Sequence, residues 1–249
     1  MSSKRPLVIA NWKMYIESPE EAKAWVSKVS RATYGAEVWA AVPAPFIPLF
    51  AKSRTAVGAQ AVSALDSMHA AHTGEVSAVM VKNSGAYFAL VGHSERRAMG
   101  DTNEVVRRQL AAALKAALVP VLCVGESARS ADGAHFSYIE EQVRSAFAGA
   151  QSLAKRVVVA YEPVWAIGKS AQAAMSAAQL EETAIFIRKV LSDVLGRPAA
   201  LKVPILYGGS VEPVNARALI TEGGVGGLLV GHASARAEEF IEILKSCSR

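Results

Sequence analysis

The sequence predicts an α/β fold: one closed (β/α)8 barrel, with eight parallel strands and outer helices, that spans residues 1–249 as a single domain. Short apolar runs alternate with helix-like patterns, and 249 residues divided among eight units gives about 31 per unit, the size of a strand–helix unit. The runs are continuous stretches of valine, isoleucine and leucine, which is typical of parallel strands buried on both faces. No linker or shift in composition divides the chain.

The expected strands follow one another along the whole chain. They begin near Leu7, Val38, Ala56, Tyr87, Val119, Val157, Val203 and Gly226. The clearest apolar runs are Leu7–Ala10, Val119–Val124, Val157–Tyr161 and Gly227–Val230.

Local signals mark three of the expected helices. The segment Ser18-Pro19-Glu20-Glu21 combines an N-cap serine, a proline at the first helical position and a Ser-x-x-Glu capping box. A second helix is expected to start within Asp101–Glu104. A third carries apolar residues from Leu180 to Leu191 and ends at Gly196, because glycine commonly follows the last helical turn.

Eight alternating units fit two architectures, a closed barrel or an open doubly wound sheet. The open sheet usually has a Gly-x-Gly-x-x-Gly turn after its first strand. Here the first strand ends in Asn11-Trp12-Lys13-Met14 instead, which favours the barrel.

Composition narrows the possible functions. Apolar residues make up 51% of the chain and the net charge is +5, which favours anionic ligands. The lysines and arginines are scattered, without the basic blocks of a nucleic-acid-binding segment, so we expect no nucleic-acid partner. No signal-peptide core or membrane-length apolar run is present, and the two cysteines form no disulfide framework or metal spacing. We therefore expect a cytoplasmic protein with no membrane attachment and no metal, in which Cys123 is a buried thiol.

One carboxylate stands out at the end of an apolar run. Glu162 follows Val158–Tyr161 directly and precedes a proline, an aromatic residue and Gly168. An unpaired charge inside a strand buried on both faces is costly, so a glutamate at its end is either a solvated turn residue or a carboxylate presented for catalysis. In a barrel, chemistry collects at the carboxyl ends of the strands, which favours catalysis.

Polar residues recur at the same place after other expected strands. Asn11 and Lys13 follow the first strand and His93 follows the fourth. Lys13 is either a surface lysine or a fixed cation near a developing oxyanion. His93 is either a structural residue or a neutral imidazole that donates to a carbonyl oxygen. Glu126 is a rival to Glu162, although we expect both Glu95 and Glu126 to pair with Lys13 or with nearby arginines instead.

Two late glycine-rich turns are candidate phosphate sites. Gly208-Gly209-Ser210 follows the seventh strand and Gly231-His232 follows the eighth. Glycine lets backbone amides approach an anion, and a phosphate site after these two strands recurs in barrels of this kind. Gly168 is expected to add a third amide.

Four segments in register resemble the triosephosphate isomerase family, a TIM barrel family, over nearly the whole chain. They are Ala10–Met14, Gly92–Arg97, Ala160–Gly168 and Tyr207–Val211. The resemblance implies interconversion of dihydroxyacetone phosphate and glyceraldehyde 3-phosphate, a small phosphorylated three-carbon substrate, without cofactor or metal.

The resemblance also assigns roles to the candidate residues. Glu162 is implied as the base, His93 as the electrophile, and Lys13 and Asn11 as stabilisers of the enediolate. The loop 163–174 is implied as a lid that closes over the substrate. Backbone amides are implied to hold the phosphate at Gly168, Ser210, Gly231 and His232.

The sequence departs from the family pattern at the lid and at the phosphate turn. Lys169-Ser170-Ala171 replaces the usual Thr-Gly-Lys, and no proline opens the next helix near Met175-Ser176. His232 replaces a frequent glycine, so its amide serves only if its backbone angles suit a residue with a Cβ.

The resemblance implies a homodimer in which the 65–75 loop reaches into the neighbouring subunit, although Met68–His72 departs from the family's usual run. Two other functions stay open: a Schiff-base aldolase that uses Lys13, and a non-catalytic barrel that binds sugar phosphates. The non-catalytic barrel is disfavoured because the four candidate catalytic residues are all present: Asn11, Lys13, His93 and Glu162.

Overall fold

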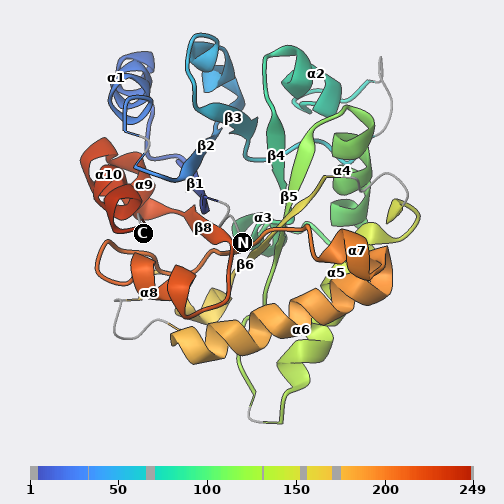
Figure 1. Cartoon of the computed structure of the whole chain (residues 1–249). Coiled ribbons are helices and arrows are strands. Elements are labelled where there is room, and N and C mark those ends of the chain that lie inside the picture. Colours follow the sequence, from blue (N-terminus) through green and yellow to red (C-terminus); the bar gives the residue numbers. More distant parts are fainter. Residues whose placement is uncertain are drawn as a thin grey trace.

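Eight parallel strands close into a barrel in the computed structural model (Figure 1), which describes residues 5–32, 34–65, 71–130, 132–151, 156–169 and 175–247. The strands follow chain order around the barrel, and β1 pairs in parallel with both β2 and β8. The predicted fold class is therefore confirmed, and each strand begins within two residues of its expected start. The strands are β1 (Leu7–Asn11), β2 (Glu37–Val42), β3 (Ala56–Ala59), β4 (Phe88–Val91), β5 (Val119–Val124), β6 (Val158–Tyr161), β7 (Ile205–Tyr207) and β8 (Gly227–Val230).

Helices cover the outside of the barrel (Figure 1), with the long α6 in orange. The longer ones are α1 (Pro19–Val29), α4 (Asn103–Lys115), α5 (Ala134–Phe147), α6 (Ala177–Leu195) and α10 (Ala237–Ser246). The shorter ones are α2 (Ala78–Asn83), α3 (Ser94–Ala98), α7 (Arg197–Ala200), α8 (Ala216–Thr221), α9 (His232–Ala235) and the 3-10 helices η1 (Ala44–Phe50) and η3 (Val164–Ala166).

The helix boundaries follow the capping signals. Ser18 accepts a hydrogen bond from the amide of Glu21 at the start of α1, and Thr102 caps α4. Helix α6 ends at Gly196, whose φ of 80° is a glycine conformation. Its start was not predicted: Ser176 and Gln179 form a reciprocal capping box, which takes the place of the missing proline.

Alternation along the strands divides the core into two layers. On β1, Leu7 and Ile9 point into the barrel, where they pack with residues such as Phe88 and Leu206. Val8 and Ala10 point outward to the helices. Successive side chains on a strand face opposite sides, so the next inward position after a strand's last apolar residue lies at the mouth of the barrel.

The barrel interior holds one of the cysteines, as predicted. Cys123 is fully buried in the same apolar cluster as Ile9 and Leu90, and Cys247, the residue after α10, is also buried. Burial raises the pKa of the Cys123 thiol, and the nearby Glu162 carboxylate raises it further. Among the described residues, no helix has the length and apolar character needed to cross a bilayer.

Candidate active site

Because successive side chains of a strand face opposite sides, two polar residues that follow inward-facing positions lie at the mouth of the barrel. Asn11 continues the inward series of Leu7 and Ile9, and Glu162 continues that of Val158 and Ala160. Both are almost completely buried, with 3% and 2% of their surface exposed. A polar residue at an inward position is therefore not a solvated turn residue here.

Glu162 is held by donors from the loop that follows β4. Its Oε1 lies 3.2 Å from His93 Nε2, and its Oε2 accepts a hydrogen bond from the backbone amide of Ser94 at 2.9 Å. The structure thus brings together two side chains that are 69 positions apart in sequence, counted as 162 minus 93. Glu162 also lines the cavity at this end of the barrel.

The imidazole of His93 is oriented by the start of α3. Its Nδ1 accepts a hydrogen bond from the amide of Glu95 at 3.2 Å, so the proton of the neutral ring belongs on Nε2. Asn11 Nδ2 lies 3.2 Å from the same Nε2. Nε2 therefore faces the barrel mouth as a hydrogen-bond donor, beside the amide of Asn11 and the carboxylate of Glu162.

Lys13 adopts a backbone conformation that is unusual for a residue with a side chain. Its φ is 48°, and two hydrogen bonds hold it there: its amide donates to Asn11 Oδ1 at 3.2 Å, and Gln60 donates to its carbonyl oxygen at 3.0 Å. Its ammonium pairs with Glu95 at 2.5 Å. Backbone strain of this kind is typical of functional positions, which favours a fixed cation over a loose surface lysine.

All eight predicted site residues line one cavity of about 740 Å³ at the carboxyl ends of the strands. They are Asn11, Lys13, His93, Glu162, Gly168, Ser210, Gly231 and His232. The topology therefore gathers residues from β1, β4, β6, β7 and β8 around one space.

The phosphate candidates have backbones suited to anion binding. Gly168 has φ 75°, and Ser210 Oγ donates to the carbonyl oxygen of Ala166 at 3.0 Å, which joins the two turns. His232 is the first residue of α9 and is not among the residues with positive φ. A Cβ is thus tolerated at His232, and its amide can serve like that of a glycine.

Glu126 is not an alternative base. Its Oε1 accepts hydrogen bonds from Tyr161 at 2.9 Å and from Trp165 Nε1 at 2.8 Å, and it does not line the cavity. Among the described residues these neutral donors are its hydrogen-bond partners, and it forms no ion pair with Lys13 or an arginine. The expected ionic pairing of Glu126 is therefore wrong. Burial and the Glu126 carboxylate raise the pKa of the Tyr161 hydroxyl. The expected pairing of Glu95 with Lys13 is confirmed.

Comparison with known proteins identifies the family. A family model described as triosephosphate isomerase matches residues 6–247. The chain belongs to the triosephosphate isomerase family. Proteins named triosephosphate isomerase from Protochlamydia amoebophila, Thermus thermophilus and Citrifermentans bemidjiense are 40%, 39% and 36% identical to it. Each alignment covers 97% of this chain, and 94%, 98% and 98% of those proteins respectively.

Several departures from the triosephosphate isomerase pattern can now be located. The altered segment Lys169-Ser170-Ala171 lies partly outside the described residues, which end at 169 and resume at 175. Lys169 itself lines the cavity, as do Tyr15 and Arg236, which were not predicted as site residues. Their only sequence signal was proximity to the predicted turns. Among the described residues, no cluster of histidine, cysteine and carboxylate side chains is arranged to hold a metal ion.

Proposed function

We propose that this protein interconverts dihydroxyacetone phosphate and glyceraldehyde 3-phosphate, with Glu162 as the base. The observation that carries the proposal is the contact between Glu162 and His93 inside one cavity that also contains Lys13 and two glycine-rich turns. Family membership supports the same reaction.

The first step is removal of a proton from the substrate carbon next to the carbonyl. The Glu162 carboxylate takes this proton, and the electron pair of the broken C–H bond moves to the carbonyl oxygen to form an enediolate. The proton of the adjacent hydroxyl group then moves to the former carbonyl oxygen, and the carboxylic acid of Glu162 returns a proton to the former carbonyl carbon. The carbon that bore the hydroxyl group becomes the new carbonyl, which exchanges aldose and ketose. Because both oxygens of Glu162 are bonded to His93 and Ser94 here, the side chain must turn toward the substrate before it acts.

The second requirement is stabilisation of the negative charge that develops on oxygen. His93 presents Nε2 to the cavity, and Asn11 Nδ2 lies beside it. The ammonium of Lys13 adds a positive charge that Glu95 keeps in place. Donors fixed before the reaction cost little reorganisation, so they lower the barrier effectively.

The third requirement is a hold on the phosphate and exclusion of water. We assign the phosphate to the amides of Gly168, Ser210, Gly231 and His232, which line the same cavity as the base. We assign the lid to residues 163–174, of which 170–174 lie outside the described residues. Closure would exclude water and strengthen the electrostatic interactions of the site.

The test is a coupled assay that supplies glyceraldehyde 3-phosphate and measures dihydroxyacetone phosphate, run in parallel in deuterium oxide. Proton transfer through an enediolate predicts deuterium on the product carbon. Borohydride trapping separates the aldolase alternative, because a Schiff base on Lys13 would leave a covalent adduct. The ion pair of Lys13 with Glu95 favours the isomerase, since a paired ammonium is not a nucleophile.

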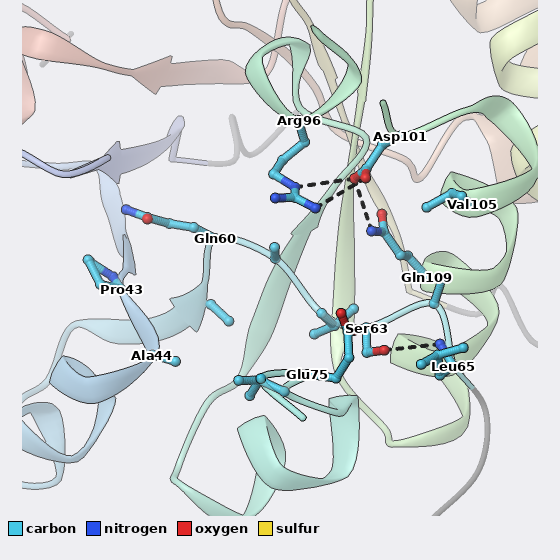
Figure 2. Close-up of a pocket in the computed structure, with 16 residues that line it drawn as sticks. Pro43, Ala44, Gln60, Ser63, Leu65, Glu75, Arg96, Asp101, Val105 and Gln109 are labelled. Atoms are coloured by element: carbon cyan, nitrogen blue, oxygen red, sulfur yellow. Dashed lines mark hydrogen bonds and ion pairs between the residues drawn. The ribbon is translucent and has the colours of Figure 1, made fainter. Parts of the chain in front are cut away.

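We also propose a homodimer formed through the 65–75 loop. Residues 66–70 of this loop lie outside the described residues. A second cavity of about 510 Å³ is lined by Leu65 and Glu75 from the described part of the loop, and by Gln60 and Arg96 among others. Figure 2 shows Arg96 and Gln109 both directed at Asp101, which accepts from them at 3.2 Å and 3.0 Å. These bonds hold one wall of the cavity in a fixed shape.

Exposed apolar residues support the same face as the dimer contact. Leu65 and Val76 line the cavity and are 37% and 39% exposed, and Met14 is 82% exposed. Met14 follows Lys13, whose carbonyl oxygen is bonded by Gln60 of this cavity. Large exposed apolar side chains around a groove favour a protein contact. A partner loop seated here would support the strained backbone of Lys13.

A further inference from the structure

A third cavity opens at the opposite end of the barrel from the candidate active site. It has a volume of about 1140 Å³ and is lined by the amino-terminal ends of five strands. The lining includes the first residue of each of the strands β1, β2, β5, β6 and β7: Leu7, Glu37, Val119, Val158 and Ile205. None of the residues proposed for catalysis lines it. We call this space the basal cavity.

Four cationic side chains line the basal cavity: Arg5, Arg156, Arg188 and Lys202. Among the described residues none of the four forms an ion pair with a carboxylate, whereas arginines such as Arg129 and Arg144 elsewhere on the surface do. The single carboxylate in the described lining, Glu37, accepts a hydrogen bond from Trp39 Nε1 at 2.9 Å. The basal cavity therefore has an uncompensated positive charge.

Two of the arginines are held in place by neutral neighbours. The guanidinium of Arg156 lies over the ring of Tyr87, 5.3 Å from its centre, and Tyr87 packs edge-on against Trp39. Arg188 donates from Nη1 to the carbonyl oxygens of Ala200 and Val203. Guanidinium groups positioned in this way are ready to bind an anion with little further loss of entropy.

The floor of the basal cavity is apolar. It consists of buried core residues at this end of the barrel, each less than 10% exposed: Leu7, Trp39, Val158 and Ile205. Ligand sites are typically concave, mostly apolar and equipped with a few polar groups that fix orientation. A floor of this kind suits the apolar body of a ligand whose anionic end faces the arginines.

We propose that the basal cavity binds a small organic phosphate that has an apolar or planar body. The phosphate contacts Arg156 and Lys202 at the rim, because guanidinium and ammonium groups form strong charge-assisted hydrogen bonds with phosphate oxygens. The apolar body lies against Trp39 and Ile205. This site is separate from the isomerase cavity and does not depend on the isomerase reaction.

Equilibrium dialysis with 1-naphthyl phosphate tests the proposal. Two matched probes are measured beside it: 1-naphthol, which lacks the phosphate group, and inorganic phosphate, which lacks the apolar ring system. We expect the complete probe to bind at least tenfold more tightly than either part. Arg156→Gln and Lys202→Gln should each weaken it about tenfold, the effect of losing one charge-assisted contact. Isomerase kcat/KM should stay within about twofold in both variants, and circular dichroism should show an unchanged fold.

Arg144→Gln is the matched control, because Arg144 is an exposed helix arginine outside the basal cavity, paired with Glu140 and Asp193. It should leave probe binding unchanged. Equal binding of 1-naphthol, or unchanged affinity in both Arg156→Gln and Lys202→Gln, would overturn the proposal. So would weaker probe binding in Lys13→Gln, since that result places the probe in the isomerase cavity, and so would the absence of saturable probe binding.

Discussion

His93 Nε2 and Glu162 Oε1 lie 3.2 Å apart, although the two residues follow different strands, β4 and β6. The contact depends on two backbone amides. Glu95 donates to Nδ1 of the histidine and Ser94 donates to the other oxygen of the glutamate. One short segment at the start of α3 therefore fixes both the imidazole and the carboxylate. This arrangement makes the chemistry of the site testable residue by residue.

Removing or shortening the carboxylate of Glu162 should lower kcat by about 10²- to 10⁴-fold, the usual contribution of a positioned general base. Glu162→Asp and Glu162→Ala are both suitable, measured by steady-state kinetics with thermal unfolding as a check on folding. Glu212→Gln is the control, because Glu212 is an exposed carboxylate that lines the same cavity. Near-normal turnover in both Glu162 variants would reject this residue as the base.

Glu95→Gln should lower kcat/KM by between about 10- and 100-fold through misplacement of Lys13, since small displacements of catalytic groups cost rate steeply. The variant removes the charge that holds the Lys13 ammonium at 2.5 Å but keeps the shape of the side chain. Lys13→Met should cost more, because it removes the cation itself.

Glu104→Gln is the control for this experiment. Glu104 pairs with Arg107 and Arg108 on the surface of α4, and such exposed pairs contribute little. The role of Glu95 is contradicted if Glu95→Gln and Glu104→Gln have equal, small effects on kcat/KM.

Gly208→Ala should impair activity more than folding. A Cβ at this position would lie 2.9 Å from Cγ of Glu162, so the carboxylate must shift. We expect kcat to fall at least tenfold and the free energy of unfolding to fall by about 1–3 kcal/mol, the usual cost of overpacking. Gly226→Ala is the matched control: its Cβ would have ordinary contacts of 3.6–3.8 Å. If both alanine variants are fully active, the close approach of Gly208 does not position the base.

Stability should decline in alkaline solution as buried thiols and a buried hydroxyl lose their protons. Burial raises the pKa of Cys247 from 9.0 to about 11 and that of Tyr207 from 10.0 to about 12. Between pH 9 and 11 the unfolded thiol has released its proton while the folded one keeps it. The unfolded state then binds fewer protons, so the free energy of unfolding falls as pH rises, and this contribution is fully present below pH 9.

Urea unfolding of the wild type and of Cys247→Ala at pH 8 and pH 10.5 measures this effect. The wild type should lose about 1–2 kcal/mol more than the variant over this interval. Cys123, whose pKa is also raised by burial, contributes to the loss in both proteins. Identical losses in the two proteins would mean that Cys247 does not titrate differently on folding.

Thr73→Arg should weaken or abolish the proposed dimer, because Thr73 lies on the exposed part of the 65–75 loop and a bulky cation there would not fit a partner's cavity. Light scattering coupled to size exclusion measures the mass at several protein concentrations. Ile185→Arg is the control, since Ile185 is 64% exposed on α6, away from the loop. A monomeric wild type, or a dimer that Thr73→Arg leaves intact, would contradict the proposed contact.

The sequence alone determined the order of the strands and the positions at which they end. Continuous apolar runs and capping residues are local signals, so β5 and the start of α1 could be located from a few neighbouring residues. The eight site residues were also named from strand ends and from family motifs, and all of them line one cavity.

Only the tertiary structure decided how these residues meet. Three features depend on which side chains the closed barrel brings together. They are the hydrogen bonds of Glu126 with Tyr161 and Trp165, the strained backbone of Lys13, and the basal cavity. Local sequence does not encode such contacts, because the groups involved are far apart along the chain. Glu126 meets Tyr161 only when β5 pairs with β6, and the turns after β8 meet Lys13 only when β8 pairs with β1. Ring closure is thus the event that turns separate strand ends into a site.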